Sequence, residues 1–165
     1  MKQRVLTAIL AVAFAFTSIA ATAQQTTNIE ASVKQIAKEF DNAKGVDCIV
    51  LEQGMGLGMI KGLFKSKFGN AFMKDVTSMV IIDYSKASAE ICNSIRSKIE
   101  STAEHLQVFT LGKEEVKEDQ YVRAYATVNG ATTITDFMII TEDSEKKTFL
   151  FMGGVLNVDK MELNL

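Results

Sequence analysis

The sequence contains no proline and no tryptophan among its 165 residues, and only one histidine. Without proline, the chain has no cis-proline turn and no proline-rich linker. The lone histidine, His105, supplies neither a histidine-rich metal cluster nor a Ser-His-Asp triad. Acidic residues outnumber basic ones by 20 to 18, so no overall positive charge favours nucleic acid. We therefore expect no metal, no cofactor and no nucleic-acid partner.

Cysteine is also scarce, and Cys48 and Cys92 are the two that the chain contains. Cys48 lies in an apolar run typical of a strand, and Cys92 in a run typical of a helix. They could form a disulfide in an oxidising compartment or remain two buried free thiols, and the sequence leaves both alternatives open. A nucleophilic pair of Cys48 with His105 is disfavoured, because a thiol inside an apolar strand is usually inert.

Acidic pairs at residues 114–115, 118–119 and 142–143 fall in predicted turns, where solvated loops explain them. No calcium-loop spacing and no other catalytic motif is present. We therefore expect a protein that is not an enzyme.

The N-terminus carries a mainly apolar run at residues 5–16, too short for the roughly 20 residues that cross a bilayer. It follows a basic start and precedes small residues ending in the tripeptide ATA. This layout is typical of a secretory signal peptide over residues 1–23, cleaved between Ala23 and Gln24. Residues 24–165 then form a single α+β domain, exported to the periplasm or secreted.

The period of the apolar residues predicts the secondary structure. Spacings of three and four predict helices at 29–40, with Asn28 as the N-cap, and at 86–103. Residues typical of strands occur at 46–51, 76–84, 106–111, 120–128, 131–140 and 147–152. Because runs of strands are set apart from the helices, we expect an α+β fold, a mostly antiparallel sheet with helices packed on one face.

The dipeptide Asn129-Gly130 lies between two alternating runs and predicts a two-residue type I′ hairpin turn. In that register Arg123 faces Asp136, and the two form a cross-strand ion pair. Val122 and Phe137 meet on the opposite face, which we expect to be the core.

The last two predicted strands are apolar on both faces, since residues 137–140 and 149–152 are consecutive apolar residues. One layer of helices covers only one face of a sheet. The second face therefore needs cover from the glycine-rich segment, the C-terminal tail, another subunit or a ligand. A homodimer through this face is one of these expectations.

The glycine-rich stretch GMGLGMIKGLFKSKFG occupies residues 54–69. It is not a dinucleotide-binding fingerprint, because Lys61 stands where the third glycine is required, and no P-loop triplet occurs. A helical wheel places Lys67 among the apolar residues, so we expect a helix that breaks near 65–69 and covers the sheet in two short pieces. The alternative is a membrane- or partner-contacting helix within Met55–Met73, with the contact residues Lys61, Phe64, Lys65, Lys67 and Phe68.

Several segments carry a family resemblance, namely FDNAKGVDCIVL, MGLGMIKGLF, SMVIIDYS, YVRAYATVNGATTITDFMIIT and FLFMGGVLNVDKM. In these segments the chain resembles the exported bacterial proteins of the domain of unknown function 4252 family, found mainly in Bacteroidetes. The resemblance implies an exported α+β domain of unassigned activity. Some members lie near genes for extracytoplasmic sigma factors, which points to envelope signalling or stress.

Two functional hypotheses follow from the sequence. The first is an exported, non-enzymatic domain of the bacterial envelope that binds a protein partner. The second is a lipid- or membrane-surface-binding protein that uses Met55–Met73.

Overall fold

The computed structural model describes residues 28–68, 72–109 and 120–158. Its elements, in chain order, are α2 (Ile29–Phe40), β1 (Asp47–Leu51), α3 (Met55–Phe68), β2 (Asp75–Asp83), α4 (Ala89–Thr102), β3 (Gln107–Phe109), β4 (Tyr121–Val128), β5 (Thr133–Glu142) and β6 (Lys147–Asn157). The α+β class is confirmed. The predicted cleavage site between Ala23 and Gln24 lies outside the described residues.

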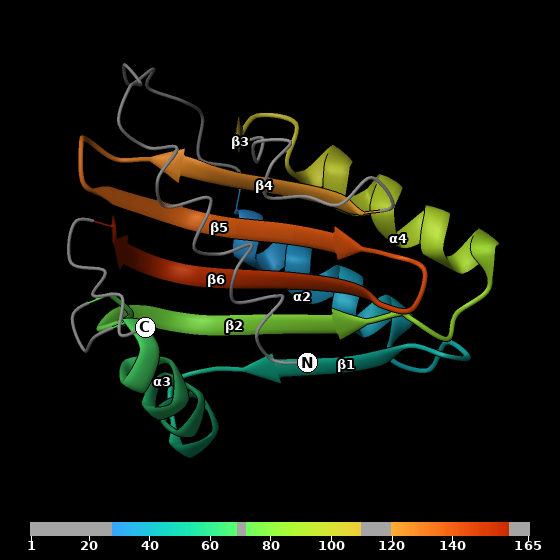
Figure 1. Cartoon of the computed structure of the whole chain (residues 1–165), viewed down its shortest axis with the longest axis horizontal. Coiled ribbons are helices and arrows are strands. Elements are labelled where there is room, and N and C mark those ends of the chain that lie inside the picture. Colours follow the sequence, from blue (N-terminus) through green and yellow to red (C-terminus); the bar gives the residue numbers. More distant parts are fainter. Residues whose placement is uncertain (1–27, 69–71, 110–119, 159–165) are drawn as a thin grey trace.

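The described strands form one antiparallel sheet in the order β1-β2-β6-β5-β4-β3. Helices α2 and α4 lie behind this sheet in Figure 1, whereas α3 lies in front of it. The predicted layer of helices on one face is therefore present, and the glycine-rich segment forms a third helix against the other face. Strands β1 and β3 are the two edges.

Side chains cap the two helices behind the sheet. The Oδ1 atom of Asn28 accepts a hydrogen bond from the Ala31 N–H at 3.0 Å, which confirms Asn28 as the N-cap of α2. The hydroxyl of Ser88 accepts one from the Ile91 N–H at 3.3 Å. Helix α4 therefore begins at Ala89, three residues after the predicted start, because Ser88 satisfies an N–H that has no partner within the helix.

Each face of the sheet has its own buried core. The helix-side core includes Val33, Ile82, Tyr84, Ile95, Ile99, Met138, Phe149 and Phe151. The second-face core includes Leu57, Met79, Ala124, Phe137, Ile139 and Met152. Leu57 of α3 belongs to the second-face core and is almost fully buried. The glycine-rich segment thus covers part of that face, as predicted.

The predicted register of the β4–β5 hairpin is wrong. Val128 pairs with Ile134, and after a bulge Arg123 pairs with Ile140 rather than with Asp136. The connection is longer than two residues, because the Asn129 N–H donates to the Thr133 carbonyl at 2.9 Å. The predicted ion pair between Arg123 and Asp136 therefore does not form.

The bulge explains where the two charges go instead. Asp136 has a φ of 50° and its carboxylate accepts hydrogen bonds from the hydroxyls of Thr127 and Thr135, at 3.2 and 3.3 Å. Arg123 lies 3.8 Å from the carboxylate of Glu100 on α4. Each charge is partnered within its own neighbourhood, and the two do not meet across the strands.

A second bulge lies between β2 and β6, where Val76 pairs with Gly154 and Ser78 with Gly153. Gly154 has a φ of 93°, and a Cβ atom added there would lie 2.3 Å from the carbonyl oxygen of Asp75. Only glycine fits this backbone. Strand β6 continues through the bulge to Asn157, five residues beyond its predicted end.

Replacing Gly154 with alanine should destabilise the fold by about 2 kcal/mol or more, because the new methyl group meets the backbone at a positive φ. As a control, Gly58→Ala on α3 should stabilise it by about 0.5–1 kcal/mol, since nothing lies within 4 Å of a Cβ added there. Urea denaturation of both variants measures the difference. Equal stability of Gly154→Ala and the parent chain would show that the bulge adapts to a side chain.

Candidate partner-binding edge

Strand β1 exposes apolar side chains at the edge of the sheet. Ile49 is 49% exposed and Val50 is 44% exposed. Ile49 pairs with Ile81, which packs on the second-face core, and Val50 pairs with Val80 in the helix-side core. Because paired residues share a face, the edge is apolar on both faces. An exposed apolar edge strand is a template for pairing with another chain.

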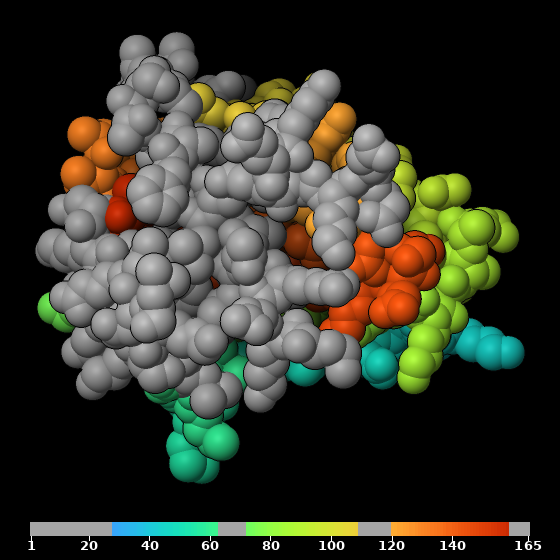
Figure 2. All heavy atoms as spheres, viewed as in Figure 1, coloured from blue at the N-terminus to red at the C-terminus, as the bar shows by residue number. Residues whose placement is uncertain are grey.

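Helix α3 adds two exposed methionines beside this edge. Met55 is 89% exposed and Met59 is 74% exposed, and a spacing of four places them on one side of the helix. Only residues 52–54 separate β1 from α3, and Figure 2 shows the green residues of α3 projecting from the molecule. Ile49, Val50, Met55 and Met59 together are called the edge surface below. Flexible methionine side chains adapt to differently shaped partners.

A hollow of about 440 Å³ lies where α3 approaches the start of β2. Gly54, Gly58 and Lys61 line it from one side, and Lys74 and Asp75 from the other. The ammonium group of Lys61 donates to the carbonyl of Lys74 at 3.1 Å. The half-buried side chain of Lys61 therefore links α3 to Lys74, the residue that precedes β2.

The other residues predicted for membrane or partner contact are Phe64, Lys65, Lys67 and Phe68, and their side chains lie outside the described part of the structure. Their backbone is helical. Because α3 runs unbroken from Met55 to Phe68, the predicted break near 65–69 does not occur before Phe68. Within the described side chains of α3, Met55 and Met59 are the large apolar ones that are exposed.

Both cysteines are free thiols, so the disulfide alternative is not realised. Cys48 sits on the helix side of β1, where burial, and then the carboxylates of Asp41 and Asp47, raise the pKa of its thiol to about 11. Cys92 lies on the buried side of α4, with the Tyr84 carbonyl oxygen 3.7 Å from its sulfur. A thiol with a raised pKa is a poor nucleophile.

Alkylation with iodoacetamide at pH 7.5 should be slow at Cys48. A pKa raised to about 11 lowers the thiolate fraction about 100-fold relative to an unperturbed thiol. The rate should rise about tenfold per pH unit up to the pKa, because only the thiolate reacts. Mass spectrometry of the folded chain measures the rate, and the urea-unfolded chain is the control. A rate already at its plateau by pH 8 would contradict the expectation.

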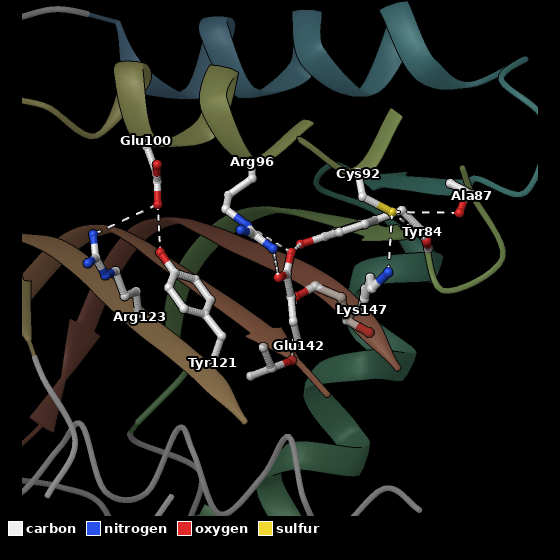
Figure 3. A network of polar contacts seen from close by, with 11 residues as sticks. Tyr84, Ala87, Cys92, Arg96, Glu100, Tyr121, Arg123, Glu142 and Lys147 are labelled. Atoms are coloured by element: carbon white, nitrogen blue, oxygen red, sulfur yellow. Dashed lines mark hydrogen bonds and ion pairs between the residues drawn. The ribbon is translucent and has the colours of Figure 1, made fainter. Parts of the chain in front are cut away.

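A polar network joins α4 to the sheet (Figure 3). Glu142 at the end of β5 is only 6% exposed, and its Oε1 atom accepts from the Tyr84 hydroxyl at 2.8 Å and from Arg96 Nε at 3.2 Å. The Nη2 atom of Arg96 donates to the other carboxylate oxygen. The Arg96 guanidinium also lies 5.0 Å from the centre of the Tyr121 ring. The acidic residue that we predicted in a solvated turn is thus a buried ion-pair partner.

A neighbouring pair extends the network towards the edge of the sheet. The Tyr121 hydroxyl donates to Glu100 at 2.6 Å, and Arg123 lies over the same ring at 5.3 Å from its centre. Burial, followed by hydrogen bonding to Glu142, raises the pKa of Tyr84 far above its ordinary value. Both Glu142 oxygens are hydrogen-bonded, so the network holds α4 against the sheet.

Removal of Arg96 should therefore cost far more than removal of Arg123. Arg96→Ala leaves the buried Glu142 carboxylate unpaired, and we expect a loss of about 3 kcal/mol. Arg123→Ala removes a contact of 3.8 Å between half-exposed groups, which should cost about 0–1 kcal/mol. Chemical denaturation of the two variants measures the contrast. Similar losses for both would show that Glu142 does not depend on its arginine.

Comparisons of the chain with models of protein families, with curated proteins and with solved structures found no match. The resemblance to the domain of unknown function 4252 family thus stays a prediction. Among residues 28–68, 72–109 and 120–158, no helix is long and apolar enough to cross a membrane. The same residues contain no group of three or more histidine, cysteine or acidic side chains placed to hold a metal ion.

Proposed function

We propose that this chain is an exported, non-enzymatic binding domain of the bacterial envelope that holds a protein partner through its edge surface. The observation that carries the proposal is the set of exposed apolar side chains Ile49, Val50, Met55 and Met59 along one edge of a sheet with two buried cores. The signal-peptide pattern over residues 1–23 supports export.

A protein fits this edge better than a lipid surface does. The outer side of β1 presents backbone N–H and C=O groups, and a lipid acyl chain cannot hydrogen-bond them. Lys61, which would face acidic headgroups, is instead bonded to the Lys74 carbonyl. These two features favour a polypeptide partner over the membrane alternative.

The described ionisable groups support a binding role over a catalytic one. Arg96 and Tyr84 both donate hydrogen bonds to Glu142, and burial raises the pKa of the Cys48 thiol to about 11. A catalytic acid, base or nucleophile needs a pKa near the working pH and a free position beside the substrate. These groups serve the fold instead.

Photocrosslinking in cells of the native host tests the proposal. Benzoylphenylalanine in place of Met59 should give one defined adduct with another protein, because that side chain is exposed on the helix that follows β1, whose outer side pairs with none of the described strands. The matched control is the same residue in place of Val108, which is 52% exposed on β3 at the opposite edge. No protein adduct at Met59, an adduct with lipid alone, or the same adduct at both positions would overturn the proposal.

A further inference from the structure

Strand β1 is an edge strand of five residues, long enough to accept an added strand. The sequence of β1, DCIVL, contains neither the lysine nor the proline that commonly protect an edge. None of the described strands pairs with its outer side. An extended segment added there would complete the hydrogen bonds of β1.

The direction of such a segment follows from the sheet. Every described pair of neighbouring strands is antiparallel, and antiparallel pairing is slightly more stable per residue than parallel pairing. An antiparallel segment would run opposite to β1. Its C-terminal end would lie beside Asp47, and its N-terminal end would lie beside Leu51 and the start of α3.

The beginning of β1 carries a concentration of negative charge. Asp47 pairs directly with Asp83 on β2, and opposed like charges destabilise a sheet. No described lysine or arginine forms an ion pair with either carboxylate. Asp83 accepts hydrogen bonds from the N–H and the hydroxyl of Ser85, at 3.0 and 2.6 Å. Lys44 and Lys86 lie in the adjoining turns, outside the strands, and are exposed.

The rest of the edge is apolar, so its chemistry changes along its length. The second face of β1 presents Asp47, then Ile49, then Leu51, and the exposed Met55 follows on α3. A complementary segment has apolar side chains in its middle and a positive charge at the end that meets Asp47. Such a charge would relieve the repulsion between Asp47 and Asp83.

We propose that β1 receives an extended segment of a partner protein as an additional antiparallel strand, with apolar side chains beside Ile49 and Val50 and lysine or arginine at its C-terminal end beside Asp47. This inference rests on the proposed function, because it specifies how the edge surface holds its partner. The main-chain hydrogen bonds supply affinity, and the charge sets direction and specificity.

A second copy of the chain fits the same edge less well. Antiparallel self-pairing about a two-fold axis at Cys48 would place Asp47 opposite Ile49 of the copy, and an axis at Ile49 would place it opposite Leu51. Neither register brings a cation to Asp47 or Asp83. An axis at Asp47 would oppose two aspartates directly. The charge pattern therefore favours a basic partner over a copy.

Three synthetic peptides test the orientation and the charge preference on the unaltered mature chain. They are TVTVTVKK, KKTVTVTV and TVTVTVEE, and fluorescence anisotropy measures their binding. We expect TVTVTVKK to bind more tightly than KKTVTVTV by about threefold to tenfold, because only the former brings lysine to Asp47 when antiparallel. TVTVTVEE should bind more weakly than either. Equal binding of the first two peptides, or tighter binding of the third, would overturn the proposal.

Hydrogen exchange shows whether the peptide becomes a strand. Saturating TVTVTVKK should slow exchange of the outward-facing amides of β1 by about tenfold or more, and leave those of β3 unchanged. Asp47→Asn together with Asp83→Asn should lower the affinity for TVTVTVKK to that for KKTVTVTV. Ile49→Lys should abolish binding, and Val108→Lys, matched in exposure on the opposite edge, should leave it intact. Protection at β3 rather than β1 contradicts strand addition.

The outcomes separate this inference from the function on which it rests. A protein adduct at Met59 with no protection of β1 by any of the peptides would refute strand addition and leave the binding function standing. Absence of the adduct removes the function itself. Sedimentation of the chain alone addresses the remaining occupant, since dimerisation that protects β1 without peptide would identify a second copy and refute the basic partner.

Discussion

The structure depends on the burial of both faces of its three central strands. Met79, Met152 and Phe151 on β2 and β6 have no solvent exposure, and Ile139 and Ile140 on β5 point to opposite cores. A sheet with two apolar faces has to be covered on both sides. Helices α2 and α4 supply one layer, and α3 contributes to the other. Among the described strands β1 is paired on one side only, and its Ile49 and Val50 are about half exposed.

The periodicity of the sequence predicts the elements, because buried faces impose a period on the residues that form them. The prediction fails at the β4–β5 register, where the expected two-residue turn at Asn129-Gly130 competes with side-chain hydrogen bonds in the same loop. A type I′ turn needs positive φ at both central residues, here Asn129 and Gly130. Gly130 has a positive φ, but Asn129 does not, because Asp136 is the one non-glycine residue with positive φ in the described part of the chain. The side-chain amide of Asn129 donates a hydrogen bond to the Thr135 hydroxyl at 2.9 Å. Such side-chain contacts favour a longer loop. The bulge at Asp136 then shifts the remaining pairs by one residue, so that Phe137 and Ile139 pack in the same core as Ile134.

Sequence reasoning identifies one part of the candidate site, the segment that forms α3, but not the other part, the edge strand β1. The glycine-rich segment is recognisable by composition, and it does carry two of the exposed apolar side chains. The edge position of β1 cannot be recognised in this way, because strand order depends on the pairing of β2 with β6. These two segments lie some seventy residues apart in the chain. The burial of Glu142 was missed for the same reason. Its partners are Arg96 on α4 and Tyr84, the residue after β2, and no pattern local to residue 142 indicates them.

The charge on β1 bears on how an open edge avoids indiscriminate pairing. Natural sheets place charged residues on exposed edges, since an added strand without a counter-charge must then desolvate them. Asp47, opposed to Asp83, makes this penalty larger for uncharged and acidic strands than for basic ones. The paired aspartates can therefore disfavour uncharged and acidic strands and still admit basic ones, because specificity is a difference between two affinities. Under the proposed strand addition, the repulsion between Asp47 and Asp83 destabilises the free domain and would also make the edge select a basic partner strand.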